Sequence, residues 1–221
     1  MREAIERFMW VSAIKPGMEE AFVEQLAAQQ EQLQSNLRER GAIVCSVFRE
    51  GNYLFTYLES AKQIDSIWTD AEMLTPLLQA WPSLDGEAGT YELRMNDIFH
   101  DDWPNVDEVP WRHSGYRAEQ RIGSLARLKP EMYSSYVFLH YQLQEEKPRL
   151  FSKYYMIGSF DQYIFSYNEL PSIVEQPRVG QLTTTNSPPD WGEAMEPHFE
   201  PWTEMVEAER LWCVMEEFFS L

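Results

Sequence analysis

An internal repeat constrains the fold of this chain more than any other feature. The sequence RFMWVSAIKPGM at residues 7–18 returns as RIGSLARLKPEM at residues 121–132, an offset of 114 residues (121 − 7). Both segments read as alternating, strand-like runs, and both end in Lys-Pro, at Lys15-Pro16 and Lys129-Pro130. Proline ends a strand and is tolerated in the first turn of a helix, so each copy is predicted to run from a strand into a helix. A chain that repeats such a unit is expected to fold as two related halves.

Each copy continues with a helical pattern and then a pair of strands. In the first copy Phe22, Leu26, Leu33 and Leu37 follow helical spacing, and Gly41 is a natural C-terminal cap. The segments YLFTY and YIFSY then match residue type for residue type, at an offset of 110 residues (163 − 53). We expect two hairpins, formed by residues 42–49 with 53–58 and by residues 154–159 with 163–167.

A second helix and a last strand complete the predicted pattern. We expect helix over residues 61–80 in the first copy, a turn-rich loop at residues 183–191 in the second, and final strands at 93–99 and 214–219. The order strand, helix, strand, strand, helix, strand is that of a ferredoxin-like βαββαβ unit. We therefore predict an α+β chain of two tandem ferredoxin-like halves, packed sheet to sheet as a pseudo-dimeric α/β barrel. The expected halves are residues 1–100 and 121–221, with residues 101–120 as the linker.

Composition limits the partners. The chain has 36 Asp and Glu against 18 Lys and Arg, a formal net charge of −18, which would repel nucleic acid and anionic membranes. No apolar run approaches the roughly 18 residues of a membrane-spanning helix, and the charged N-terminus does not read as a secretory signal. Cys45 and Cys213 lie in apolar runs, as small buried hydrophobes do. We expect a cytoplasmic protein with a small-molecule partner such as a neutral sugar, no nucleic acid and no membrane, and a further homodimer stays open.

The chemistry is expected on the helix of the second copy, MYSSYVFLHYQLQEE at residues 132–146. It places Tyr136 and His140 four residues apart and therefore on one face of the helix. In the first copy Phe22 and Leu26 stand at the matching positions, so only the second copy has a pair of proton-handling side chains. We predict a working site in the C-terminal half and a degenerate one in the N-terminal half. The alternative is that Tyr136 and His140 pack in the core, with the imidazole bonded to a carbonyl.

These signatures resemble the L-rhamnose mutarotase family, small dimeric α/β-barrel enzymes that interconvert the anomers of a deoxy-sugar. The Tyr-x-x-x-His motif of that family matches Tyr136 to His140, one Trp of its Trp pair matches Trp202, and its terminal run resembles EFFSL at residues 217–221. The resemblance implies a cofactor-free isomerase that opens a small sugar ring by acid/base catalysis, with His140 and Tyr136 as catalytic residues. It implies that Trp202, Tyr163 and Tyr167 bind the sugar.

Other functions stay open on the sequence. One is a non-catalytic, ligand-binding or stress-related α/β barrel protein. Another is a monooxygenase or haem enzyme of the same superfamily, because histidines on this fold ligate haem in related families. His100 beside Asp101 and Asp102 is a weak metal candidate, and a solvated strand end is the simpler interpretation, so we predict no metal site.

Overall fold

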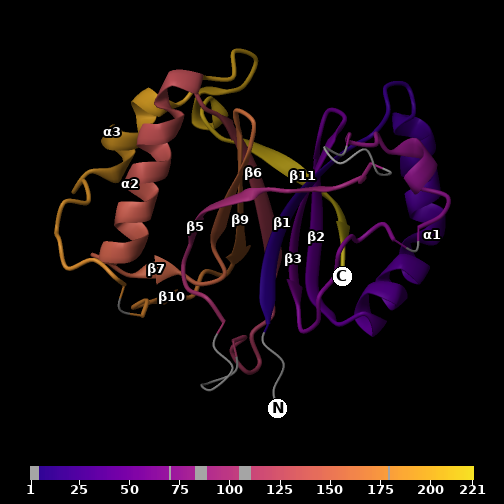
Figure 1. Cartoon of the computed structure of the whole chain (residues 1–221), viewed down its shortest axis with the longest axis horizontal. Coiled ribbons are helices and arrows are strands. Elements are labelled where there is room, and N and C mark those ends of the chain that lie inside the picture. Colours follow the sequence, from indigo (N-terminus) through magenta and orange to yellow (C-terminus); the bar gives the residue numbers. More distant parts are fainter. Residues whose placement is uncertain (1–4, 70, 83–88, 105–110, 179) are drawn as a thin grey trace. The chain divides into compact units, whose positions relative to one another are not determined.

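The chain is an α+β protein that divides into two compact units (Figure 1). A computed structural model describes residues 5–69, 71–82, 89–104, 111–178 and 180–221, so residues 105–110 of the expected linker lie outside the described residues, as do residues 1–4. Unit 1 comprises residues 1–95, 104–115 and 216–221, and unit 2 comprises residues 96–103 and 116–215. Among the described residues no helix is both long and apolar enough to cross a lipid bilayer.

Unit 1 packs an antiparallel sheet against one long helix. The strand order is β4–β1–β3–β2–β11, and the helix α1 buries Phe22, Leu26, Leu33 and Leu37 against it, as the spacing predicts. Gly41 follows the helix with φ +99°, a conformation that favours glycine. The elements of unit 1 are β1 (Glu6–Ala13), α1 (Glu19–Glu39), β2 (Ala42–Glu50), β3 (Tyr53–Ser60), η1 (Thr75–Leu77), β4 (Leu93–Arg94) and the end of β11 (Cys213–Ser220).

Unit 2 repeats this arrangement with the strand order β11–β6–β9–β8–β5 and the helix α2. The helix begins after Pro130 and ends before Pro148, at Lys147 with φ 44°, which confirms the predicted helix. The elements of unit 2 are β5 (Asn96–His100), β6 (Gln120–Arg127), η2 (Pro130–Met132), α2 (Tyr133–Glu146), β7 (Phe151–Ser152), β8 (Met156–Phe160), β9 (Tyr163–Leu170), β10 (Val174–Glu175), α3 (Trp191–Met195), η3 (Glu196–His198), η4 (Glu207–Glu209) and the start of β11.

The last strand of each sequence repeat pairs, wholly or in part, in the unit formed mainly by the other repeat. β5 follows the first repeat in sequence, and it pairs with β8 of unit 2. β11 starts in unit 2, where Cys213–Met215 pair with β6, and it ends in unit 1, where Glu216–Ser220 pair with β2. Each unit therefore contains strand residues from both sequence repeats.

The helix predicted at residues 61–80 is wrong. The described residues of this range, 61–69 and 71–80, form turns, bends and the short η1, although the apolar side chains Ile67 and Trp68 are fully buried. Side chains occupy the backbone donors that a helix would use: Glu92 accepts from the Ile67 amide at 2.9 Å, and Ser66 accepts from the Trp68 amide at 3.0 Å. Pro76 lies in the first turn of η1, where its missing amide costs no hydrogen bond.

The sequence repeat extends to individual hydrogen bonds. The Lys15 ammonium donates a hydrogen bond to the carbonyl oxygen of Pro76 at 2.7 Å, and the Lys129 ammonium donates one to the carbonyl oxygen of Pro197 at 2.8 Å. The Lys-Pro dipeptides that mark the repeat in sequence therefore make the same contact in both units. This correspondence allows the two units to be compared residue by residue.

Candidate ligand-binding site

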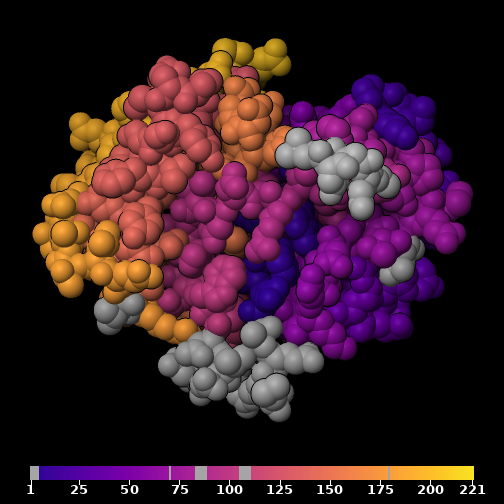
Figure 2. All heavy atoms as spheres, in the orientation of Figure 1, coloured from indigo at the N-terminus to yellow at the C-terminus, as the bar shows by residue number. Residues whose placement is uncertain are grey.

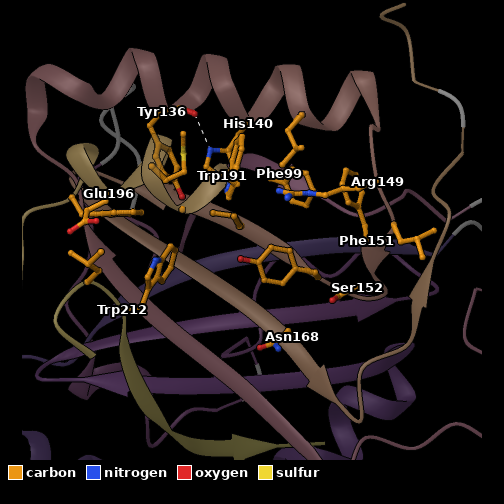
Figure 3. A pocket seen from close by; sticks show the side chains of 18 residues that line it. Phe99, Tyr136, His140, Arg149, Phe151, Ser152, Asn168, Trp191, Glu196 and Trp212 are labelled. Atoms are coloured by element: carbon orange, nitrogen blue, oxygen red, sulfur yellow. Dashed lines mark hydrogen bonds between the residues drawn. The ribbon is translucent and has the colours of Figure 1, made fainter. Parts of the chain in front are cut away.

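Unit 2 contains a pocket of about 550 Å³ beside the helix α2. Its walls are mostly apolar and come from β5, α2, β7, β8, β9 and α3, from the segments that follow α2 and α3, and from the residues just before β11. In Figure 3 Tyr136 and His140 point from α2 into this space, and Asn168 and Ser152 lie across it. Helix α2 itself lies at the surface of unit 2 (Figure 2), with Phe138 on its outward side 62% exposed. The aromatic side chains that line the pocket are Phe99, Tyr136, Phe151, Tyr155, Trp191, Phe199 and Trp212.

His140 enters the pocket as a neutral hydrogen-bond acceptor. Its Nδ1 lies 2.9 Å from the carbonyl oxygen of Tyr136, and since a carbonyl only accepts, Nδ1 carries the proton (Figure 3). Burial lowers the pKa of His140 from 6.5 to about 4, against the hydrogen bond to the Tyr136 carbonyl, which raises it. Nε2 has no hydrogen-bond partner among the described residues. At neutral pH the imidazole therefore presents a lone pair that a ligand's O–H or N–H can use.

Tyr136 carries a buried hydroxyl without a partner. Its side chain is fully buried, and among the described residues nothing hydrogen-bonds to the hydroxyl oxygen. Burial raises the pKa of this phenol well above 10, so it is protonated and available as a donor. Leaving a buried hydroxyl unpaired costs about 1–3 kcal/mol. An unpaired donor beside a pocket thus indicates where a ligand's polar group would lie.

Aromatic rings hold the two polar side chains in place. The ring centroids of Tyr136 and His140 are 4.1 Å apart, and the Trp191 ring meets the imidazole edge-on at 4.9 Å with an interplanar angle of 83°. Phe99 approaches the imidazole from β5 at 6.1 Å. These contacts restrict the imidazole rotamer and surround it with hydrocarbon, which explains the direction of its pKa change.

The loop that precedes Trp191 is hydrogen-bonded to Glu146, the last residue of α2. Glu146 accepts hydrogen bonds from the hydroxyl of Thr184, the amide of Asn186, and both the amide and the hydroxyl of Ser187. Burial opposes ionisation, but these hydrogen bonds, led by that of Ser187, lower the pKa of Glu146 well below its usual range. The predicted turn-rich loop is therefore ordered by one carboxylate, and α3 begins directly after it.

Unit 1 has hydrocarbon where unit 2 has polar groups. The Lys15 amide donates to the carbonyl of Leu77, and the Lys129 amide donates to the carbonyl of His198, so His198 corresponds to Leu77. His198 is 3% exposed and lies 6.0 Å from Tyr136, ring centre to ring centre. Three neighbouring positions are thus apolar in unit 1 and polar in unit 2. They are Phe22 and Tyr136, Leu26 and His140, and Leu77 and His198. Two of the three, Tyr136 and His140, are one turn apart in the sequence and could be paired from it, whereas His198 lies 58 residues further along (198 − 140).

Three residues that the sequence associated with ligand binding lie outside this pocket. Trp202 donates its indole N–H to the carbonyl of Leu125 at 3.3 Å, and its ring stacks under the Arg127 guanidinium at 4.4 Å. Tyr167 is fully buried and donates to Glu169 at 2.6 Å. Tyr163 begins β9 and does not line the pocket.

The weak metal candidate is used within the protein. His100 Nδ1 lies 2.8 Å from Asp97 Oδ2, and Asp101 accepts from the Tyr154 amide at 3.1 Å. Lys147 forms an ion pair with Asp102 at 3.1 Å. Over the described ranges no group of three or more His, Cys, Asp or Glu side chains could hold a metal ion.

Comparison with known proteins yields only distant likenesses. No family model matches the chain, and no curated protein matches it. A putative monooxygenase from Lactobacillus acidophilus has a similar structure, with 8% identity over 99% of this chain and 96% of its own and a TM-score of 0.39. A second protein of that description, from Fusobacterium nucleatum, has 8% identity over 77% and 78% and a TM-score of 0.36. An anthrone oxidase-like protein has 10% identity over 76% and 73% and a TM-score of 0.32.

The assignment to the L-rhamnose mutarotase family is wrong. No family model supports it, and the similar solved structures are named for oxygenases and oxidases instead. The pocket agrees with this correction, because a sugar needs hydrogen-bonding partners for several hydroxyls and these walls are mostly hydrocarbon. The sugar isomerase function and the carbohydrate-binding role of Trp202, Tyr163 and Tyr167 fall with the assignment.

Proposed function

We propose that unit 2 binds a flat, largely apolar organic molecule through one hydroxyl group, as a fused-ring phenol would bind. The observation that carries the proposal is the pair of unused polar atoms in an apolar pocket: the Tyr136 hydroxyl and His140 Nε2. In the proposed complex a phenol O–H donates to Nε2 and its oxygen accepts from the tyrosine, whose ring centroid lies 4.1 Å from that of the imidazole. The pocket volume of about 550 Å³ falls within the range of small-molecule sites.

The pKa values indicate that the ligand's proton stays on its oxygen in the resting complex. A simple phenol has a pKa of about 10, and His140 has one of about 4 in the empty pocket. Transfer of the proton to Nε2 would therefore cost about 8 kcal/mol before any stabilisation of the ion pair formed. A neutral hydrogen bond is the lower-energy arrangement, and binding is thus the first function we propose.

The second candidate is cofactor-independent monooxygenation of the same kind of ligand. It is favoured by the free lone pair of His140, since a base within reach of the ligand's O–H can accept its proton as the aromatic ring gives electrons to O₂. In the overall reaction one oxygen atom enters the ring to give a quinone, and the other leaves as water with the two hydrogens that the ligand loses. The apolar walls would exclude water from the reactive ring. Oxygen uptake with 2-naphthol or anthrone above the rate in buffer would support this candidate. A visible absorption spectrum of the purified protein tests haem, which the sequence leaves open.

Isothermal titration calorimetry with matched probes tests the binding proposal. 2-Naphthol carries the donor O–H, whereas 2-methoxynaphthalene has the same rings without it. We expect 2-naphthol to bind the unaltered protein more tightly than the ether, and His140→Leu, which installs the residue type of unit 1, to remove the difference. Tyr163→Phe lies outside the pocket and serves as the control. Equal affinity for the two probes, or an unchanged preference in His140→Leu, would contradict the proposal.

We also propose that each half of the chain is a divergent copy of one ferredoxin-like ancestor. Two matched hydrogen bonds support this: Tyr57 donates to Glu59 and Tyr167 donates to Glu169, each at 2.6 Å. The sheet-to-sheet packing of the halves and the boundaries of the sequence-based domains stay predictions.

A further inference from the structure

Of the two charged side chains that line the pocket, Arg149 is the one without an ion-pair partner among the described residues. The charged side chains that line the pocket are Arg149 and Glu196, because His140 is neutral. Arg210 neutralises Glu196 through a direct ion pair and also bridges to Glu207 at 2.6 Å. Arg149 makes no hydrogen bond and no ion pair with any described residue. The side chain is exposed, so water solvates its charge in the empty protein and a carboxylate of a ligand can reach it.

The Arg149 side chain is exposed to solvent and also lines the pocket, beside the Trp191 ring. Its guanidinium carbon lies 5.8 Å from the centroid of the Trp191 ring, the same ring that meets His140 edge-on. In Figure 3 it points into the pocket from the side of Phe151, and Glu196 lines the opposite side. Stacking on an indole orients the planar guanidinium without using any of its five N–H donors. The donors thus stay available to a ligand in the same space as the His140 lone pair.

We propose that the natural ligand is a hydroxylated aromatic carboxylic acid, whose carboxylate is bound by Arg149 while its hydroxyl lies at His140 and Tyr136. This inference rests on the proposed function, since it names the class of ligand for the same pocket. A carboxylate matches the planar fork of the guanidinium and can accept two parallel hydrogen bonds. One uncompensated cation also suits a single negative charge, and the net charge of −18 disfavours a dianion such as a phosphate monoester.

Calorimetry with 2-naphthol and 6-hydroxy-2-naphthoic acid tests the inference, because the acid adds only a carboxylate at the far end of the same rings. We expect the acid to bind roughly tenfold or more tightly than 2-naphthol at low ionic strength, and this advantage to shrink as salt is added. In Arg149→Gln the advantage should vanish, so that the variant binds the acid no more tightly than it binds 2-naphthol. Arg127→Gln is the matched control, since Arg127 also stacks on a tryptophan but lies outside the pocket.

The outcomes separate the two proposals. If 2-naphthol binds but the acid binds no more tightly, or if Arg149→Gln keeps the preference for the acid, the inference about Arg149 is wrong and the proposed function stands. If Arg127→Gln abolishes the preference as fully as Arg149→Gln, the effect is one of overall charge and the inference is again wrong. If neither probe binds the unaltered protein, the proposed function fails, and the inference fails with it.

Discussion

Replacing Tyr136 with Phe should make the protein more stable and a poorer binder. The hydroxyl is fully buried and unpaired among the described residues, so the empty protein carries its desolvation cost without a compensating hydrogen bond. That cost is about 1–3 kcal/mol for a buried hydroxyl. Phe22 occupies the matching position of unit 1 and is itself fully buried, so the ring alone is compatible with this helix and sheet. We take about 1 kcal/mol as the expected gain, at the low end of the range, because removing the oxygen leaves a small void.

Thermal unfolding followed by circular dichroism measures this gain. For a chain of 221 residues, a stabilisation of about 1 kcal/mol raises Tm by roughly 2–4 °C. The same substitution removes one neutral hydrogen bond to the ligand, worth about 0.5–1.5 kcal/mol, so the Kd for 2-naphthol should rise by roughly 2-fold to 10-fold. A rise in Tm together with a loss of affinity is the expected combination.

Tyr167→Phe is the matched control, and its change in Tm should have the opposite sign. Its hydroxyl donates to the buried carboxylate of Glu169 at 2.6 Å, so removing it should lower Tm. If Tyr136→Phe lowers Tm as Tyr167→Phe does, the Tyr136 hydroxyl has a partner in solution and the reasoning about the site is refuted. If Tm rises but the Kd is unchanged, the hydroxyl is unpaired and the ligand does not use it.

The remaining predictions concern pH and the loop. Burial lowers the pKa of His140 from 6.5 to about 4, so between these pH values the imidazole is protonated in the unfolded chain and neutral in the folded one. The free energy of unfolding, measured in urea titrations, should therefore rise with pH from about 4 to 6.5. Binding of 2-naphthol should be lost only near pH 4, where the folded protein protonates His140. Glu92 has the opposite sign: burial raises its pKa from 4.5 to about 7, so the free energy of unfolding should fall as pH rises through this range, and Glu92→Gln should remove the slope. Glu146→Gln should speed amide hydrogen exchange at Asn186 and Ser187, because a neutral amide accepts more weakly than a carboxylate; unchanged exchange there would show that Glu146 does not fix the loop.

The elements that the sequence predicted correctly are those set by local pattern. Alternation predicted the strands, and a four-residue apolar spacing predicted α1, where Phe22 and Leu37 are fully buried. Lys15-Pro16 and Lys129-Pro130 marked the start of both long helices, because the effect of a proline on its neighbours acts within a few residues. The error at residues 61–80 has the opposite cause. Glu92 holds the Ile67 amide across 25 residues of sequence, and no local pattern shows such a contact.

Some residues of the candidate site could be predicted from local spacing, and others depend on contacts between distant elements. Tyr136 and His140 could be found because they lie one turn apart on one predicted helix. Trp191 could not, since its place beside His140 depends on a loop that returns to the helix from 51 residues further along the chain (191 − 140). Arg149 follows α2 closely in sequence, but its place in the pocket depends on its contact with Trp191. With eight Trp in the chain, composition could not distinguish Trp191 from Trp202, which proved to stack on Arg127 outside the pocket.

The comparison of the two units explains why the site is found in unit 2. In unit 1 the Trp68 ring meets Phe22 edge-on at 5.7 Å, is fully buried, and has its indole N–H satisfied by Ser12 at 3.0 Å. In unit 2 the Trp191 ring meets His140 edge-on but stays half-exposed at the wall of the pocket. Closing that space with hydrocarbon would stabilise unit 2, as it does unit 1, whereas keeping it open leaves polar atoms unpaired at a cost of about 1–3 kcal/mol each. Unit 2 carries this cost at the Tyr136 hydroxyl, next to the lone pair of His140, where unit 1 has hydrocarbon, and an unpaired donor beside a pocket is typical of a ligand site.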